Sequence, residues 1–502
     1  MSTSAASSRA GGRASGGWRA LLALCAAATL GGCAVGPDFV RPAPPAVTEY
    51  VPGTAATTTA SADGRVQHFA TGAAVPADWW RRLGAPGLDA TVAEALARSP
   101  TLASANATLR QSEDQRRAGY GVFFPSLGVD LGASRQRASP LRFGQAGPSS
   151  VFNLFTLTGA VSYLVDVFGG ARREVEALGA QVDLERSALL ASYLTLTSNV
   201  VNASIARSAY RAELEATHAI VDAAAERVAL AEVQYRAGTI PYAALLSLRA
   251  DLAATRAALP PLELRAEQAG HLISVLAGHP PAEWTAPETR LEDYVLPENL
   301  PLALPSELVR QRPDVLGAEA RLHEASAAIG IATADLLPRL TLSGSLGSDA
   351  TTWSELGGAN GRFWSAGADL SVPLFQGGSA WYARKASIDA YEAARADYRQ
   401  AVLAAFQQVA DALRALEHDA DAVREQGASL EASRTARALV DANYRSGTAD
   451  YLAVLVADRQ FRTAQVGYLA AVAQRLQDTV ALFAALGGGW AAAGAPSGGG
   501  AR

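Results

Sequence analysis

One long segment occurs twice in the sequence, and this duplication constrains the fold more than any other feature. The motif Tyr-Arg-x-Gly-Thr occurs at Tyr235–Thr239 and again, roughly 200 residues later, at Tyr444–Thr448. The likeness continues downstream, where the apolar run Leu272–Gly278 corresponds to Ala481–Gly487. Solenoid repeats have periods of about 20–50 residues, so the pattern indicates a duplicated half. Each half is expected to form one structural unit.

Composition and motifs argue against nucleic-acid binding and against catalysis. The net charge of -5 is spread along the 502 residues, whereas a nucleic-acid site needs a clustered basic face. The six histidines are scattered, and His323-Glu324 lacks the second histidine of a zincin helix. The sequence contains no phosphate-binding Walker motif. We expect no enzyme activity, no metal site and no cofactor, and we expect a partner to supply any transport energy.

Residues 1–32 have the features of a bacterial export signal. Three arginines precede an apolar stretch at residues 20–30, which is too short to cross a bilayer. The segment ends Leu-Gly-Gly before Cys33, as in a lipoprotein signal peptide, and Cys33 is the predicted lipidation site. The alternative is ordinary signal cleavage beside an incidental cysteine. Because Cys25 is removed with the signal, Cys33 has no disulfide partner, which favours lipidation.

The chain then alternates between helical and strand-like periodicity. Residues 33–86 are expected to be extended. Helical spacing follows from Leu88 to Gly119 and from Leu304 to Ala334, broken at Ser99-Pro100 and at Arg312-Pro313. Period-two alternation then predicts two β-hairpins of about ten-residue strands, at about 122–167 and about 337–375.

The strand pattern has two interpretations. It fits a soluble sandwich, but about ten residues also suits a tilted membrane-crossing strand. Aromatic residues gather at the strand ends, as an interfacial girdle requires. They are Phe123, Phe124, Phe152, Phe168, Trp353, Phe363 and Phe375. Four strands cannot close a barrel, and an open edge in lipid leaves backbone groups unpaired, so we expect the chain to oligomerise.

A long antiparallel helical hairpin is predicted after each β-hairpin. The outgoing helices cover about 170–236 and 379–445, each ~100 Å long. Apolar residues recur at every seventh position in part of each helix, as in a coiled-coil seam. They are Val175, Val182, Leu189 and Leu196, and Val402, Val409 and Leu416. They end at Gly238 and Gly447, which supply left-handed turn residues. Thr239 and Asp450 are the predicted N-caps of the returning helices. Pro260-Pro261 is expected to interrupt the first returning helix.

These patterns predict six segments. They are a signal peptide (1–32), an extended segment (33–86), a first repeat (87–278), a linker (279–303), a second repeat (304–487) and a disordered tail (488–502).

Particular motifs resemble the TolC-like outer-membrane efflux factors, most closely the NodT-type lipoproteins of resistance-nodulation-division pumps. The motifs are Cys33–Pro37, Trp79-Trp80, Leu259–Leu262, Arg312–Asp314 with Ala318–Ala320, and both Tyr-Arg-x-Gly-Thr turns. The resemblance implies a mixed α and β membrane protein. In that family a homotrimer shares a twelve-stranded transmembrane β-barrel, four strands per chain, continuous with a periplasmic α-helical barrel.

The same resemblance implies function, location and partners. The protein is expected to be a passive exit duct for drugs or other small molecules, lipid-anchored in the outer membrane of a Gram-negative bacterium. Ala34 after Cys33 favours the outer membrane, by resemblance to bacterial lipoproteins. The implied partners are a periplasmic adaptor, an inner-membrane transporter of the resistance-nodulation-division type, and outer-membrane lipid.

The repeated turns are implied to form the periplasmic tip, where the adaptor docks. The residues are Tyr235, Arg236, Gly238, Thr239, Tyr444, Arg445, Gly447 and Thr448. Leu452 and Asp458 are the expected aperture residues, although Val456 stands where the family often has an aspartate. Tyr444, Arg445 and Asp458 are expected to tether the second hairpin through exposed pairs of about 0.2–1 kcal/mol each.

Three other functions remain as alternatives. One is the outer-membrane duct of a type I protein secretion or heavy-metal efflux system. Another is a lipid-anchored periplasmic adaptor, which explains Cys33 but not two helical hairpins. A stand-alone diffusion porin does not explain the long helices.

Overall fold

The computed structural model describes residues 34–52, 58–144 and 146–489, and the chain divides into two compact units. The first comprises Met1–Arg41, Gln111–Val182 and Ala320–Ala396. The second comprises Pro42–Arg110, Asp183–Glu319 and Asp397–Arg502. Each predicted repeat contributes to both units. The predicted signal peptide, Cys33 and most of the predicted tail lie outside the described residues.

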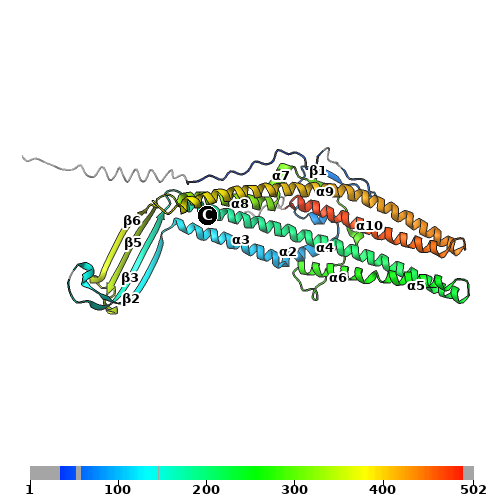
Figure 1. Ribbon diagram of the computed structural model, residues 1–502, viewed down its shortest axis with the longest axis horizontal. Coiled ribbons are helices and arrows are strands. Elements are labelled where there is room, and N and C mark those ends of the chain that lie inside the picture. Colours follow the sequence, from blue (N-terminus) through cyan, green and yellow to red (C-terminus); the bar gives the residue numbers. More distant parts are fainter. Residues whose placement is uncertain (1–33, 53–57, 145, 490–502) are drawn as a thin grey trace, which may run out of the picture. The chain divides into compact units, whose positions relative to one another are not determined.

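The first unit contains a four-stranded antiparallel sheet, coloured cyan to yellow (Figure 1). In spatial order its strands are β2 (Ser126–Ala138), β3 (Ser150–Val165), β5 (Arg339–Ala350) and β6 (Arg362–Ser371). β2 pairs with β3 and β5 pairs with β6, as the two hairpins predicted from period-two alternation require. Strand lengths run from 10 to 16 residues, so most strands are longer than expected.

The two halves of the sequence share this sheet. β3 of the first half pairs with β5 of the second half, from Phe155 opposite Ala350 to Val165 opposite Leu340. The expectation that each half forms its own structural unit is therefore wrong. An isolated two-stranded hairpin is marginal in water, whereas three or more strands with an apolar face can be stable. The greater stability of a four-stranded sheet therefore favours pairing of the two hairpins with each other.

The sheet leaves much of its apolar surface exposed on the chain. Leu127, Val129 and Leu131 alternate along β2 and therefore lie on one face, with exposed fractions of 80%, 72% and 59%. On β6, Trp364 and Leu370 are 77% and 63% exposed. A contiguous exposed apolar surface of this kind marks contact with a membrane or another protein.

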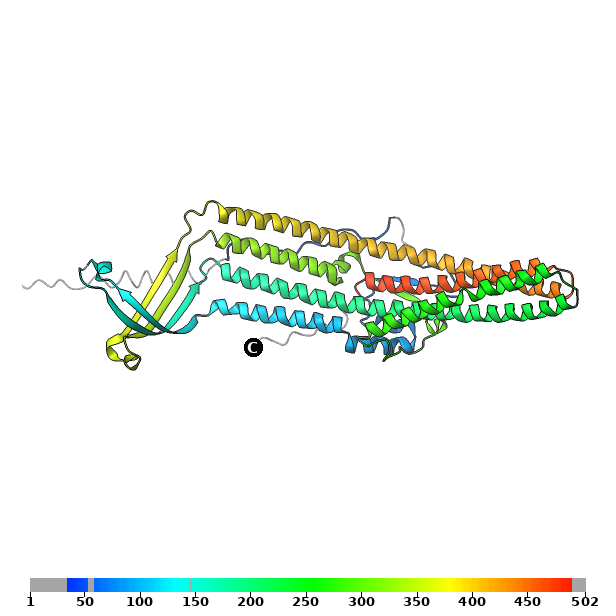
Figure 2. The ribbon, with the colours of Figure 1, turned by 60° about the horizontal axis from the view of Figure 1, so that its bottom comes forward.

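Each strand of the sheet is connected to a helix. α3 (Pro100–Gly119) leads to β2 through the single turn η3 (Tyr120–Phe123), and α8 (Pro313–Ala334) leads to β5. α4 (Gly170–Arg236) follows β3, and α9 (Ser379–Arg445) follows β6. Figure 2 shows the ends of these helices next to the sheet lying side by side in strand order. α4 and α9 cover the residues of the two predicted long helices.

The seven-residue repeat on α9 is buried, as a helix-packing seam requires. Val402 is 6% exposed, and Val409 and Leu416 are fully buried. Of the equivalent α4 residues, Val175, Val182 and Leu196 are also buried, and Leu189 is partly buried. The heptad pattern read from the sequence therefore marks the packed face of each long helix.

Prolines end and restart the shorter helices. α2 (Pro86–Arg98) stops at Ser99, and α7 (Pro305–Gln311) stops at Arg312. Each stop residue precedes a proline and has a ψ angle near 120°, at 121° and 125°, because the proline ring disfavours helical geometry before it. Both predicted breaks are confirmed.

The returning helices differ between the halves. The first is divided into α5 (Tyr242–Arg256) and α6 (Leu259–Leu276), with the break just before Pro260 and Pro261. The second, α10 (Tyr451–Ala485), continues for 35 residues. The predicted interruption of the first returning helix is confirmed. None of the helices in the described part of the chain is both long and apolar enough to cross a membrane.

Short elements complete the second unit and the loops of the sheet. β1 (His68–Thr71) and β4 (Asn299–Leu302) pair in parallel. The single turns are η2 (Trp79–Leu83), η4 (Pro140–Phe143), η5 (Leu291–Asp293), η6 (Trp353–Glu355) and η7 (Ala359–Gly361). In the second unit the fully buried Trp79 stacks on Phe483 of α10, with ring centroids 5.3 Å apart. This stack fixes η2 against the end of α10.

Candidate functional site

The first repeated turn joins α4 to α5. Gly238 has a φ of 75°, the left-handed geometry that glycine adopts without a Cβ penalty. The Gly238 amide donates to the Tyr235 carbonyl at 2.9 Å, and the Thr239 amide donates to the Gln234 carbonyl at 2.9 Å. The Thr239 hydroxyl donates to the same Gln234 carbonyl. Thr239 therefore caps the end of α4, and its predicted role as N-cap of α5 is wrong, because Pro241 occupies that position.

The second turn, between α9 and α10, has the same backbone pattern. Gly447 has a φ of 78°, and its amide donates to the Tyr444 carbonyl at 3.0 Å. Both the amide and the hydroxyl of Thr448 donate to the Asn443 carbonyl. The Asp450 side chain accepts from the Ala453 amide at 2.9 Å, so its predicted role as N-cap is confirmed.

Aromatic side chains surround and connect the two turns. The Tyr444 hydroxyl donates to the Gln234 side chain across 3.4 Å, which links the second turn to the first. The Tyr235 and Tyr242 rings lie 5.2 Å apart and are 42% and 50% exposed. Two similar turns therefore lie together and present exposed aromatic surface.

An apolar cluster holds α5 against α4 behind the first turn. Its buried members are Val221, Ala224, Val228, Ala231, Leu245, Leu248 and Leu252. Ile240 and Tyr451 pack against the cluster, so the start of α10 also contributes. Burial is the largest cause that raises the pKa of Tyr451, to about 12.

Asp458 of α10 lies in a buried ion triad that joins three helices. It contacts Arg227 of α4, and it accepts from Nε of Arg437 of α9 at 2.8 Å. The Asp458 side chain is 9% exposed, and the Arg437 guanidinium lies 4.9 Å from the Phe461 ring centroid. Burial, followed by the neighbouring Arg437, lowers the pKa of Arg227. The expectation of a weak exposed tether at Asp458 is wrong, because packed helices enclose this carboxylate.

The other expected tip and aperture residues make local contacts or are exposed. Arg445 pairs with Asp441 one turn earlier on its own helix at 2.8 Å, so within the described chain it does not tether the hairpin. Arg236 Nε donates to the Glu232 carbonyl of α4. Leu452 is 62% exposed. Val456 is 48% exposed.

The sequence reasoning missed Arg227 and Arg437, and it also missed a second ion pair between the hairpins. Arg462 of α10 donates to Asp251 of α5 at 3.1 Å. Arg437 and Asp458 lie at nearly equal distances along the chain from Gly447, so an antiparallel hairpin brings them together. This spacing could have predicted the pair of Arg437 and Asp458 from the sequence. Nothing local indicated Arg227, which belongs to the other hairpin.

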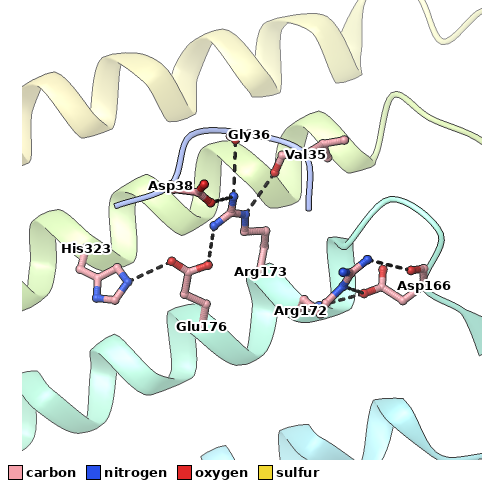
Figure 3. A network of polar contacts seen from close by, with 8 residues as sticks. All are labelled: Val35, Gly36, Asp38, Asp166, Arg172, Arg173, Glu176 and His323. Carbon is pink, nitrogen blue, oxygen red and sulfur yellow. Dashed lines mark hydrogen bonds and ion pairs between the residues drawn. The ribbon is translucent and has the colours of Figure 1, made fainter. Parts of the chain in front are cut away.

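The segment directly after Cys33 is bound tightly within the first unit, although Cys33 itself is outside the described residues. Figure 3 shows Arg173 of α4 between Glu176 and the segment. Arg173 donates to the Val35 carbonyl at 3.1 Å and to the Asp38 carboxylate at 2.6 Å. The Arg173 side chain is 4% exposed. Glu176 also contacts His323 of α8 at 3.0 Å, which extends the network to a second helix (Figure 3).

Close backbone contacts reinforce this attachment. A Cβ on Gly36 would lie 2.5 Å from Cα of Gly330 on α8, and Gly36 has a φ of 92°. The Phe39 ring stacks on the His323 ring with centroids 4.3 Å apart. α4, the helix beside the segment, is capped at its N-terminus, because Asp166 accepts a hydrogen bond from the Ala171 amide at 3.2 Å.

The described residues contain no group of histidine, cysteine and carboxylate side chains placed to hold a metal ion.

Comparisons with known proteins agree with this architecture. A family model described as outer membrane efflux protein matches residues 91–279 and again residues 304–488. The pyoverdine export outer membrane protein OpmQ of Pseudomonas aeruginosa is 32% identical over 422 residues, covering 82% of this chain and 87% of OpmQ. Nodulation protein T of Rhizobium leguminosarum bv. viciae is 28% identical over 474 residues, 92% of each chain.

Solved structures give the same result. The outer-membrane channel OprN matches with a TM-score of 0.82 at 29% identity, over 91% of this chain and 100% of that chain. The mixed α and β, TolC-like fold expected from the motifs is confirmed. The two separate family matches also agree with the internal duplication. This chain belongs to the outer membrane efflux protein family.

Proposed function

We propose that this protein is the outer-membrane channel component of a tripartite efflux pump and serves as a passive exit duct for small molecules. The observation that carries the proposal is the sheet of the first unit, whose apolar side chains are exposed on the chain. Its outer strands β2 and β6 each have one paired neighbour among the described strands. An apolar sheet with open edges fits a membrane wall that other copies complete.

The working assembly is a homotrimer. Unpaired backbone groups in the hydrocarbon core cost several kcal/mol each, so the edges of β2 and β6 need partners in a membrane. Three copies joined edge to edge supply twelve strands in one closed barrel. A closed arrangement of this kind removes both edges, and its outward apolar band contacts lipid.

The anchor is a lipidated Cys33. Several acyl chains on one residue give stable membrane attachment, at about 0.8 kcal/mol per buried CH₂. The Arg173 network supports the proposal, because it holds residues 35–38 against α4 at the helix end that follows β3. Mass spectrometry of the mature N-terminal peptide tests it, and an unmodified terminus at another residue would contradict it.

The paired turns form the tip that docks a periplasmic adaptor, and the adaptor connects the duct to an inner-membrane transporter of the resistance-nodulation-division type. Exposed Tyr235 and Tyr242 offer aromatic surface of the sort enriched in protein interfaces. Leu452 narrows the passage in the resting state. The Asp458 triad keeps α10 against α4 and α9, and adaptor binding opens the aperture by separating these helices.

Conductance of the purified protein in planar bilayers tests the duct, and native mass measurement in detergent tests the trimer. A trimer with discrete channel openings is the expected result, and Leu452→Ala should increase the single-channel conductance. Exposed Leu439→Ala on α9 is the control for loss of a leucine side chain. A lipid-anchored adaptor would conduct no current, and a conducting monomer would contradict the closure argument.

A further inference from the structure

A cavity of about 640 Å³ lies within the second unit, bordered by α4, α9, α10 and the start of α8. Methyl groups form much of its wall, including Ala412 and Ala415 of α9 and Ala481 of α10. No residue of the two repeated turns lines it. The volume falls in the range of small-molecule sites, about 300–1,000 Å³.

Two polar side chains of α4, Ser198 and Asn202, line this cavity one helical turn apart. The Ser198 hydroxyl oxygen and the Asn202 carbonyl oxygen are buried, and neither has a hydrogen-bond partner among the described residues. A buried polar atom without a partner costs about 1–3 kcal/mol. Each oxygen gains a hydrogen bond when its side chain turns toward the cavity and meets a ligand that donates one.

The charged residues around the cavity leave it negative. Arg312 donates to both oxygens of the Asp314 carboxylate, at 3.0 and 2.7 Å, and also to the Ala485 carbonyl at 2.7 Å. Its charge is therefore matched by Asp314. Asp411 and Asp478 also line the cavity, and each accepts an amide hydrogen bond from a glutamine on its own helix. These two carboxylates have no cation to balance them in the cavity lining.

We propose that this cavity binds an organic cation, an ammonium group attached to a compact apolar body. The ammonium donates to the Asp478 carboxylate and the Asn202 carbonyl, which come from facing helices. The apolar body lies against the alanine methyl groups. Asp478 and Ala485 are seven residues apart on α10, about 10 Å at 1.5 Å per residue, so the cavity accommodates more than a simple ion.

A second carboxyl group beside Asp478 couples this binding to pH. Burial, and then the neighbouring Asp478, raise the pKa of Asp419 to about 7, while Arg475 opposes the shift. Arg475 is itself bound to Gln67 and Thr59. A cation beside Asp478 offsets the negative charge that holds the proton on Asp419, so binding releases that proton. The affinity for the cation therefore increases as the pH rises toward about 7 and then levels off.

Fluorescence anisotropy of dansylcadaverine, a primary ammonium probe, measures the binding to the full-length protein in zwitterionic nanodiscs. Neutral dansylamide is the matched ligand control. Asp478→Asn and Asn202→Leu should each weaken dansylcadaverine binding about tenfold or more, the cost of losing one hydrogen bond to a charged group. Asp421→Asn removes an equal charge from an exposed site on α9 and should leave the affinity unchanged.

The pH series gives an independent readout. The affinity of the wild-type protein for dansylcadaverine should rise between pH 5 and 7, by at most about tenfold per pH unit. Asp419→Asn should flatten this rise. Equal binding of dansylamide, or unchanged affinity in both Asp478→Asn and Asn202→Leu, would overturn the proposal. If size-exclusion chromatography shows that either variant does not assemble, dansylcadaverine binding to Ser198→Ala and the pH series test the proposal instead. The measurement involves no transport, so a negative result leaves the proposed duct function standing.

Discussion

Replacing Asp458 with asparagine leaves Arg227 and Arg437 without their shared carboxylate. Removing one partner from a buried ion pair costs about 3–5 kcal/mol, whereas an exposed pair contributes about 0–1 kcal/mol. Asp458 is 9% exposed, but the two arginine side chains keep 24% and 29% of their surface in solvent. We therefore expect the change to cost about 2–4 kcal/mol, between these limits. Local opening of α10 from α4 and α9 should become roughly 30- to 1,000-fold more frequent.

Hydrogen exchange with mass spectrometry measures this opening, because amide protection reports the local free energy of unfolding. The expected loss of protection is confined to peptides around residues 227, 437 and 458. Glu431→Gln is the matched control, since Glu431 of α9 pairs with Arg434 at 3.2 Å and both side chains are over half exposed. That substitution removes the same charge and should cost less than about 1 kcal/mol.

The reasoning is refuted if Asp458→Asn changes protection no more than Glu431→Gln does. A second comparison uses the double variant Asp458→Asn with Arg227→Gln. Because this variant also removes the unpaired, partly buried Arg227 cation, it should recover part of the lost protection. Strictly additive losses would mean that the two side chains act independently, contrary to the contact between them.

Three further outcomes are expected. Gly447→Ala places a Cβ at a φ of 78° and should destabilise the second turn by about 1–2 kcal/mol. Faster hydrogen exchange at the end of α9 measures this loss. The control is Gly270→Ala on helix α6, where the added Cβ meets open space and should not destabilise the helix. Arg173→Ala removes the contacts to Val35 and Asp38 and should speed proteolysis of the N-terminal segment, whereas an unchanged cleavage rate would argue against the attachment. The raised pKa of Asp419 means that the folded state binds more protons than the unfolded state, so the free energy of unfolding should fall as the pH rises from about 4 to about 7. Thermal unfolding at several pH values measures this dependence, and Asp419→Asn should remove it. An unchanged dependence in that variant would assign it to other groups.

Local chemistry allowed much of the fold to be predicted. Ser99 and Arg312 end helices because a proline follows each of them, and these stops needed no distant contact. Gly238 and Gly447 end the long helices for an equally local reason, a positive φ. Thr239 was assigned to the wrong helix, because its hydroxyl reaches either neighbouring element and only the folded turn decides between them.

The sequence by itself determined the duplication, the helix and strand periods, and the turn residues, because each depends on neighbours within a few positions of the chain. Only the tertiary structure decided that β3 pairs with β5, since each hairpin leaves two open edges and the local pattern does not specify which edges meet. It also decided the partner of Asp458, because Arg227 is distant in sequence and reaches it only when α4 packs against α10. Burial then changed the strength of that contact, since a charge pair enclosed by packed helices is screened far less than the same pair in water.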